Sequence, residues 1–186
     1  TTEIYTLSLH DALPISSLQR VHMPELDAEY RSHNNEEVNL GLTPEMAMLE
    51  AQRCIDCANP TCMEGCPVSI YIPKFVKQIE VGDFLGAAKT LKETSALPAV
   101  CGRVCPQEKQ CEAQCIHVKM KKEPVAIGHL ERFAADYERE SGNISVPEVA
   151  ASNGIKIAVV GSGPAGLSFA GDMAKLGYDV TVFEAL

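Results

Sequence analysis

The pattern of hydrophobic and polar positions changes once along the chain, near residue 153. Before that point the chain shows helix starts and apolar residues at helical spacing, as in Ile127, Leu130, Ala134 and Tyr137. After it, two short β-branched runs at residues 155–160 and 179–183 flank a glycine-rich turn and a helix-like segment to residue 176. The pattern therefore predicts a helical part followed by a strand, a helix and a second strand.

Capping residues locate the helices of the first part. Thr43-Pro44-Glu45 supplies a hydroxyl cap, a proline at the first helical position and an early acid, so a helix should run to Arg53 and present Cys54 at its end. Pro73 opens a second helix that Gly82 ends. Further helices are expected at 84–93, where Asp83 is the cap, at 106–115, where Cys111 and Cys115 would share one face, and at 127–139.

These signals divide the chain into four parts. Residues 19–140 form a helical domain, residues 141–153 a linker, and residues 154–186 the start of a nucleotide-binding domain. Residues 1–18 carry no period, cap or basic face, so we expect them to be non-native or disordered. The chain stops directly after its second strand, and a two-strand unit is too small for a nucleotide-binding sheet, so we expect further sequence downstream.

Composition excludes several classes of function. The 186 residues are 46% hydrophobic and 22% charged, as in a folded protein. The net charge of −9 argues against nucleic acid or an anionic membrane as a partner, because both require a basic surface. No apolar run approaches the roughly 20 residues that span a bilayer. Because no signal peptide is apparent at the start, we expect a cytoplasmic protein whose thiols stay reduced.

Eight cysteines fall into two groups of four. Both groups contain short spacings of two to five residues, and prolines lie at or inside them; the members are Cys54, Cys57, Cys62 and Cys66, then Cys101, Cys105, Cys111 and Cys115. Thiolates at such spacings converge on a soft metal centre, and eight is close to the requirement of two cubane iron–sulfur clusters. Structural zinc remains an alternative, although only Cys54 and Cys57 have the short zinc-knuckle spacing. A disulfide scaffold is disfavoured because it needs an oxidising compartment.

The glycine-rich turn has the context of a dinucleotide-binding motif. It runs Gly161-Ser162-Gly163-Pro164-Ala165-Gly166 between a strand and a helix, and Glu184 follows at the end of the next strand. The first glycine allows the tight turn, the second admits the pyrophosphate, and the third permits close packing of the helix on the sheet. Glu184 would accept hydrogen bonds from a ribose diol and repel a 2′-phosphate, which favours FAD or NAD over NADP here. The alternative for Glu184 is a solvated strand end.

Four motifs follow one another from about residue 20 to the end of the chain. They are Met23-Pro24-Glu25, RCIDCANPTCMEGCPVSIYIP from Arg53, LPAVCGRVCPQEKQCEAQC from Leu97 and VVGSGPAGL from Val159. In these motifs the chain resembles the small (β) subunit of NADPH-dependent glutamate synthase, the amino-terminal region of dihydropyrimidine dehydrogenase, and the large subunit of NADH-dependent ferredoxin:NADP oxidoreductase.

The resemblance implies how the metal ligands divide. One 4Fe-4S cluster would take Cys54, Cys57, Cys62 and Cys115, and the other would take Cys66, Cys105, Cys111 and Glu131, the last lying sixteen residues past Cys115. It implies the fold class too, which is a mostly α-helical two-cluster domain of the α-helical ferredoxin type followed by the first βαβ unit of a truncated Rossmann-like FAD-binding domain.

The residues allow an independent view of Glu131. On the expected helix it shares a face with Leu130 and Ala134, so the carboxylate points toward the apolar side, where a metal would compensate its burial. The alternative is a glutamate paired with Arg132, Arg103 or a lysine. Cys101 is left over as a buried thiol near a cluster or as a ligand in place of Glu131.

We do not expect the other polar residues near the cysteines to bind metal. We expect His117 and His129 to be solvated or locally hydrogen-bonded. Lys119, Lys121 and Lys122 form a basic run that is a solvated surface, an offset to the negative charge of the clusters, or a partner contact.

The resemblance implies an oxidoreductase. The complete protein would take hydride from NADPH or NADH onto FAD and pass single electrons through two clusters to a partner, either a flavin-containing large subunit such as that of glutamate synthase or a ferredoxin. We expect the 186 residues alone to be inactive with NADPH. A pure iron–sulfur electron-transfer or docking module and a zinc-stabilised interaction domain remain the alternatives.

Overall fold

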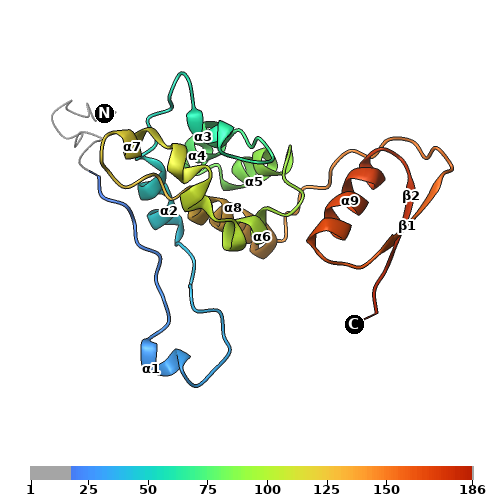
Figure 1. The fold of residues 1–186 in the computed structure, drawn as a ribbon, viewed down its shortest axis with the longest axis horizontal. Coiled ribbons are helices and arrows are strands. Elements are labelled where there is room, and N and C mark those ends of the chain that lie inside the picture. The colour runs from blue at the N-terminus through green and yellow to red at the C-terminus, as the bar shows by residue number, and fades with distance from the viewer. Residues whose placement is uncertain (1–17, 186) are drawn as a thin grey trace, which may run out of the picture.

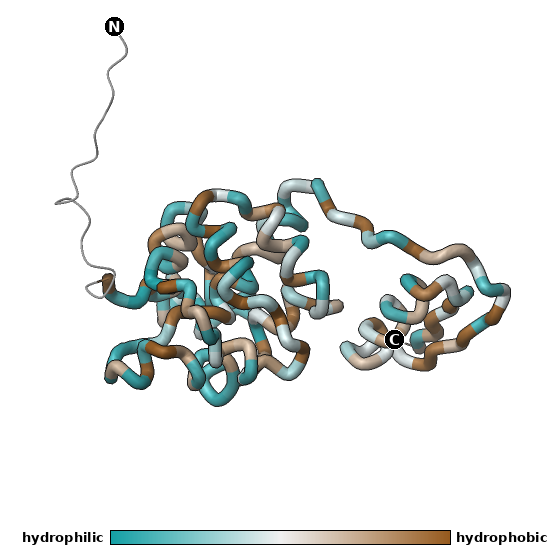
Figure 2. The backbone as a smooth tube through the Cα atoms, turned by 90° about the horizontal axis from the view of Figure 1, so that it is seen from above, coloured by the Kyte–Doolittle hydropathy of each residue, from teal (hydrophilic) through white to brown (hydrophobic). Residues whose placement is uncertain are grey.

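The computed structural model describes residues 18–185, and these form a helical part and a βαβ unit at opposite ends of the long axis (Figure 1). The expectation for residues 1–17 lies outside the described residues. Seen from above, an extended stretch of chain joins the two parts (Figure 2). The change of hydrophobic period near residue 153 thus coincides with a physical separation in the molecule.

The described elements are mostly short helices. Their bounds are α1 Ala28–Arg31, α2 Pro44–Ala51, α3 Thr61–Glu64, α4 Ile72–Glu80, α5 Phe84–Lys92, α6 Pro98–Val104, α7 Ile116–Lys119, α8 Ile127–Ser141, β1 Lys156–Val160, α9 Pro164–Lys175 and β2 Asp179–Phe183. The predicted starts of α2 and α5 are confirmed. Thr43 Oγ1 accepts from the amide of Met46 at 3.3 Å, and Asp83 Oδ1 accepts from the amide of Gly86 at 3.0 Å.

The core of the helical part lies between α2, α4, α5 and α8. The apolar positions of α4 recur every three or four residues, so Phe75, Val76 and Ile79 are fully buried on one face. Phe84 at the start of α5 packs edge-on against Phe133 of α8 at a ring distance of 5.0 Å. This packing holds α8 as the central helix against which the cysteine-bearing segments lie.

The helix predicted for residues 106–115 is wrong. Two 3₁₀ turns, Gln107–Lys109 and Glu112–Gln114, occupy this stretch, and Gln110 between them leaves the helical region with φ −114° and ψ −113°. The backbone here meets the chain before Cys66, since a Cβ on Gly65 would lie 2.7 Å from the Gln110 carbonyl oxygen. Packing against this neighbouring loop overrides the local helical pattern. The pattern also missed the short helices α1, α3, α6 and α7.

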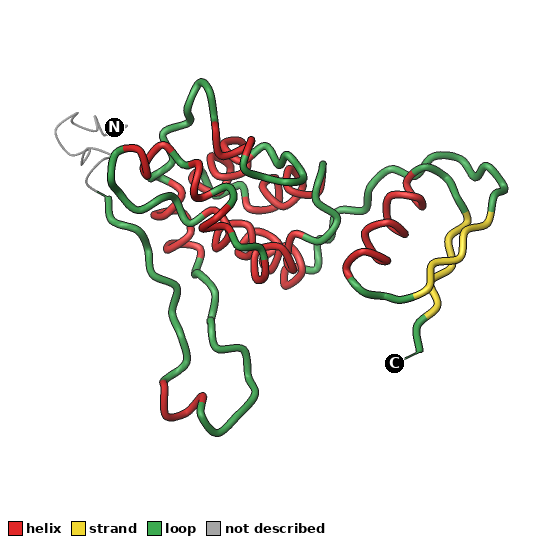
Figure 3. The backbone as a smooth tube through the Cα atoms, in the orientation of Figure 1, coloured by secondary structure: helices red, strands yellow, loops and turns green. Residues whose placement is uncertain are grey.

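The βαβ unit has the predicted topology. β1 and β2 pair in parallel with Lys156 opposite Asp179, and α9 connects them (Figure 3). The first strand is held to the end of the second by the Gly161 amide, which donates to the Phe183 carbonyl at 2.8 Å. The described unit is therefore a single parallel crossover, with α9 joining two paired strands.

An arm of residues 22–41 projects from the helical part with α1 at its tip (Figures 1 and 3). Its two limbs meet in a single antiparallel bridge between Glu25 and Asn39. Arg132 of α8 fixes the base by donating to the Asn39 carbonyl at 2.8 Å. Among the described helices, none is long and apolar enough to cross a membrane.

Candidate metal centres

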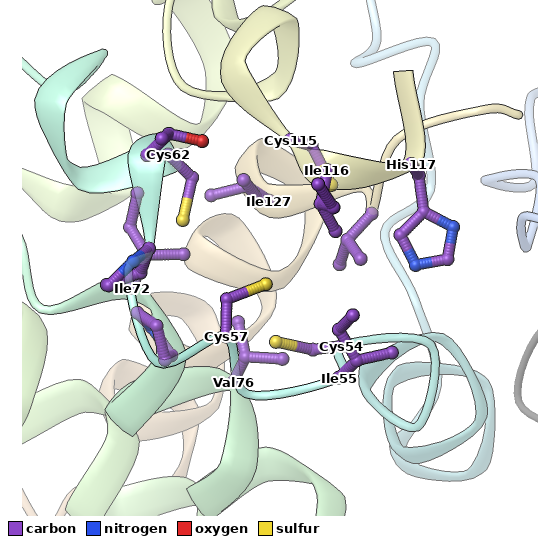
Figure 4. Close-up of a pocket in the computed structure, with 14 residues that line it drawn as sticks. Cys54, Ile55, Cys57, Cys62, Ile72, Val76, Cys115, Ile116, His117 and Ile127 are labelled. Atoms are coloured by element: carbon purple, nitrogen blue, oxygen red, sulfur yellow. The ribbon is translucent and has the colours of Figure 1, made fainter. Parts of the chain in front are cut away.

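Four cysteines from three segments line one opening in the helical part (Figure 4). Cys54 and Cys57 come from the loop after α2, Cys62 from α3, and Cys115 is the N-cap residue of α7. The opening has a volume of about 420 Å³, part of which is open to solvent. The structure thus brings together the four residues that the resemblance assigns to one cluster.

The walls of this opening are apolar. Ile72 and Val76 of α4 and Ile127 of α8 line it together with the cysteines (Figure 4). Burial raises the pKa of the Cys54 thiol and raises the pKa of the Cys62 thiol to about 12. An apolar site disfavours a bare thiolate, so a bound cation is the natural compensation for these sulfur atoms.

Local backbone geometry shapes this first group. Asp56, between the first two cysteines, has φ +48°, a left-handed conformation that is unfavourable for a residue other than glycine. Its amide is hydrogen-bonded to the Cys54 sulfur, an interaction that favours the thiolate. On the opposite side, Thr61 Oγ1 donates to the Gln114 carbonyl at 2.6 Å and ties α3 to the segment before Cys115. These contacts hold distant stretches of sequence around one space.

The second predicted group also comes together. The pKa of Cys105 is raised to about 11, mainly by burial and in smaller part by the charges of Cys101, Glu131 and Cys66. The pKa of Cys111 is raised to about 12, again mainly by burial and in smaller part by the charges of Glu112, Cys66 and Glu131. The predicted ligands Cys66, Cys105, Cys111 and Glu131 therefore lie within electrostatic range of one another.

Glu131 is buried without a compensating partner. The residue is 6% exposed, and its Oε1 has no hydrogen-bond partner among the described residues. Burial raises the pKa of its carboxyl group to about 7. The neighbouring Arg132 and Arg103 instead bind Asp136 and Glu37, so the alternative of an ion pair with either arginine is wrong. An orphaned carboxylate oxygen facing cysteines fits a metal ligand.

Close packing of two helices places Glu131 beside Cys105. A Cβ on Gly102 of α6 would lie 2.6 Å from the Arg132 amide nitrogen of α8, so only glycine fits this contact. Cys101, also on α6, contacts Cys105 through its side chain. Its sulfur accepts a hydrogen bond from Ser95 Oγ at 3.9 Å. Cys101 is thus the eighth thiol beside the second group and remains an alternative to Glu131 as a ligand.

Neither group is arranged for a single ion. Among the described residues, no three His, Cys, Asp or Glu side chains gather closely enough to hold one metal ion. Four thiolates on one zinc ion lie about 3.8 Å apart, the separation that Zn–S bonds of 2.3 Å give in a tetrahedron. In a cubane cluster each thiolate binds a different iron, so its ligands stand farther apart.

The histidines near the cysteines lie in surroundings that disfavour their charged form. His117 is buried, its Nε2 lies 2.9 Å from the Arg53 carbonyl oxygen, and burial lowers its pKa. Burial also lowers the pKa of the half-buried His129. The Nδ1 atoms of both have no partner among the described residues. His117 is therefore locally hydrogen-bonded rather than solvated, and both roles had been expected from the sequence.

The glycine-rich turn between β1 and α9 has the geometry of a tight strand-to-helix connection. Gly161 has φ +97°, and a Cβ on Gly166 would lie 2.2 Å from the Gly161 carbonyl oxygen. A Cβ on Gly163 would meet nothing within 4 Å, so space remains beside the N-terminus of α9. Glu184 turns back onto this loop, and its Oε2 accepts from the Ser162 amide and hydroxyl, both at 2.7 Å. The remaining members of the predicted site, Pro164 and Ala165, open α9.

Sequence reasoning missed a buried polar centre beside the first cysteine group. Glu50 and Arg53, at the end of α2, form an ion pair of 2.6 Å with side chains 0% and 2% exposed. Arg53 also donates to the carbonyls of Glu123 and Pro124. No sequence pattern marks this pair, because its partners are backbone groups about 70 residues away.

Comparison with known proteins gives two family matches. Residues 31–143 match the family model described as dihydropyrimidine dehydrogenase domain II, 4Fe-4S cluster. Residues 156–186 match the model described as pyridine nucleotide-disulphide oxidoreductase. The two matches fall on the helical part and the βαβ unit, respectively.

Individual relatives agree with these matches. The NAD-dependent dihydropyrimidine dehydrogenase subunit PreT of Salmonella typhimurium is 39% identical over 149 residues, which are 80% of this chain and 36% of the relative. The glutamate synthase [NADPH] small chain of Escherichia coli is 36% identical over 167 residues, which are 90% of this chain and 35% of the relative. The chain spans about a third of the length of these curated relatives.

Proposed function

Because the chain belongs to the family of dihydropyrimidine dehydrogenase domain II, the 4Fe-4S cluster domain, we propose that it is the iron–sulfur part of an NAD(P)H-linked oxidoreductase subunit. In this proposal the subunit passes electrons from NAD(P)H, through FAD and two 4Fe-4S clusters, to a partner. Of the relatives named above, the glutamate synthase [NADPH] small chain fits this activity most directly.

One observation carries the proposal. Cys54, Cys57, Cys62 and Cys115 face a single apolar opening, although up to 61 residues separate them along the chain. Thiols that served only as core residues would have no reason to share one opening to the surface. A cluster in this place would be held by four thiolates, with α4 and α8 keeping bulk water away from the sulfur atoms.

The second centre is proposed at Cys66, Cys105, Cys111 and Glu131. Support comes from the partnerless Oε1 of Glu131 and from the mutual electrostatic influence of these groups. An iron ligand would satisfy this oxygen and stabilise the ionised carboxylate despite its burial. A carboxylate in place of a thiolate would change the potential of this cluster relative to the first.

The βαβ unit is proposed to bind the ADP portion of FAD. Gly161, Gly163 and Gly166 leave backbone room near the first turn of α9, whose amides and dipole favour phosphate. Glu184 would exchange its bond to Ser162 for the ribose diol. When bound, FAD accepts hydride from NAD(P)H and releases electrons one at a time.

The remaining assignments follow from the same proposal. The partner is a large flavin-containing redox subunit or a ferredoxin. The domain boundaries in this proposal are 19–140, 141–153 and 154–186. A cytoplasmic location suits the eight free cysteines, which need reducing conditions to remain available for metal.

Metal analysis of the protein purified without oxygen tests the proposal. The expected result is a brown protein with about eight iron and eight sulfide per chain, since each cluster contains four of each. A colourless protein that contains zinc would instead identify the zinc-stabilised interaction domain. Full-length protein with clusters but no flavin absorption would identify a pure electron-transfer module.

A further inference from the structure

An exposed apolar and basic strip lies directly beside the first cysteine group. We call it the α7 edge and define it as residues 118–121, Val118-Lys119-Met120-Lys121, together with Ile55. Val118, Met120 and Ile55 are 43%, 44% and 44% exposed. Ile55 and the first residues of α7 line the same opening as the cysteines (Figure 4).

The α7 edge lies close in sequence to a ligand of the proposed first cluster. Cys115 is the N-cap residue of α7, so the exposed side chains of the helix begin three residues from a ligand sulfur. Figure 1 places α7 at the end of the helical part farthest from β1, β2 and α9. An electron that enters from a flavin held by the βαβ unit would therefore reach the surface here, on the opposite side of the molecule.

The charge of the α7 edge is opposite to that of the whole chain. The chain carries a net charge of −9, yet the α7 edge contains Lys119 and Lys121 and no acidic residue. Among the described residues, Lys119 and Lys121 make no ion pair, whereas Lys74, Lys77 and Lys92 are each paired with a glutamate. The charges of Lys119 and Lys121 are thus available to a partner rather than neutralised within the described fold.

The backbone holds Lys121 in an unfavourable conformation. Its φ is +56°, and the turn is closed by the Lys121 amide on the Val118 carbonyl at 3.0 Å and the Lys122 amide on the His117 carbonyl at 2.9 Å. Glycine is the preferred residue at this position of a helix end. A glycine substitution here relieves strain, so it removes the charge without a penalty to the fold.

We propose that the α7 edge is the docking surface for the acidic face of a one-electron redox protein. The lysines attract the acidic partner, and Val118, Met120 and Ile55 exclude water at the centre of the contact. Each transfer oxidises the adjacent centre by one electron and reduces the partner's centre by one, with no bond made or broken. This inference rests on the proposed function, because it requires a redox centre at the first cysteine group.

Binding to two probes of opposite charge tests the surface. The full-length protein is titrated by calorimetry at low ionic strength with an acidic ferredoxin and with a basic cytochrome c. The variants are Lys121→Gly, the double variant Lys119→Glu/Lys121→Glu, and Lys89→Glu as a control that makes the same kind of charge change on the exposed side of α5. Reduction of a neutral quinone by NAD(P)H is measured in parallel.

The double variant is expected to weaken ferredoxin binding at least about tenfold and to strengthen cytochrome c binding, with the difference disappearing in high salt. Lys121→Gly should weaken ferredoxin binding by a smaller factor and leave the melting temperature unchanged or raised. Equal ferredoxin affinity in wild type and double variant, or an equal loss in Lys89→Glu, overturns the docking surface. Failure of the wild type to reduce the quinone contradicts the proposed function separately, since the binding measurement does not depend on it.

Discussion

Glu50 and Arg53 form a buried ion pair, with 2.6 Å between Glu50 Oε1 and Arg53 Nη1. Arg53 lies one residue before the first cysteine, Cys54. Each partner also holds backbone from elsewhere. Glu50 accepts from the amides of Val21 and Ala126, and Arg53 donates to the carbonyl of Glu123. The pair therefore fixes the loop that begins at Cys54 to the segment that leads into α8.

Replacement of Arg53 by methionine is expected to destabilise the helical part by about 3–5 kcal/mol, because it leaves the Glu50 carboxylate buried and unpaired. Chemical denaturation of the cluster-free protein measures this effect. The double variant Glu50→Gln/Arg53→Met should recover part of the loss, since no buried charge remains. A single variant as stable as wild type would show that the pair contributes little.

Two glycines of α9 give a matched comparison. Gly166→Ala should loosen the contact of α9 with the glycine-rich turn, because the new Cβ would lie 2.2 Å from the Gly161 carbonyl oxygen. Gly171→Ala meets nothing within 4 Å and should stabilise the same helix by up to about 1 kcal/mol. Amide hydrogen exchange of α9 reports both. Similar exchange rates in the two variants would contradict the close packing.

The lowered pKa of Glu138 predicts that the stability of the fold depends on pH. Burial opposes ionisation of this carboxyl group, but Lys92 at 2.6 Å and the Ser145 amide and hydroxyl outweigh it, so its pKa is lowered from 4.5. A lowered folded-state pKa contributes stability above the unfolded value, and this contribution is lost as the pH falls through the folded value.

The Glu138→Gln variant should accordingly be less stable than wild type by about 1 kcal/mol at pH 7, and the difference should shrink below pH 4.5. Melting curves of both proteins between pH 3 and pH 7 supply the test. Glu140→Gln is the control, because Glu140 is 73% exposed and lies 3.6 Å from Arg139 in a solvent-exposed ion pair. A constant difference at all pH values would rule out the ionic contribution.

Glu131→Ala is expected to remove or shift the signal of one cluster and leave the other unchanged. The reason is that Glu131 lies beside Cys105 and Cys111, away from the opening lined by Cys54. Electron paramagnetic resonance of the reduced protein distinguishes the two signals. Unchanged spectra for both would discard Glu131 as a ligand and favour Cys101.

Sequence reasoning located the elements that local chemistry determines. Thr43 and Asp83 cap their helices as predicted, and β1, α9 and β2 follow from the change of period. It failed at residues 106–115, where the loop before Cys66 forces two 3₁₀ turns, and at the ion pair of Glu50 and Arg53. Both depend on contacts between distant stretches, which a local pattern does not contain.

The candidate site shows the same division. The spacing of the cysteines indicated metal binding, and burial of Glu131 could be anticipated from its helix face. The grouping of Cys115 with Cys54 rather than with its sequence neighbour Cys111 came from the resemblance. In the structure, the turns around Gln110 direct Cys111 and Cys115 toward different groups.

Iron content of three cysteine variants tests the central claim most directly. Cys54→Ser, Cys115→Ser and the double variant Cys54→Ser/Cys115→Ser are purified without oxygen, and iron is counted per chain. Since both residues belong to one cluster in this account, each single variant and the double variant should all retain about four iron, the content of the other cluster. A double variant with no iron, formed from single variants that each keep about four, would show that Cys54 and Cys115 serve different clusters and would contradict the account.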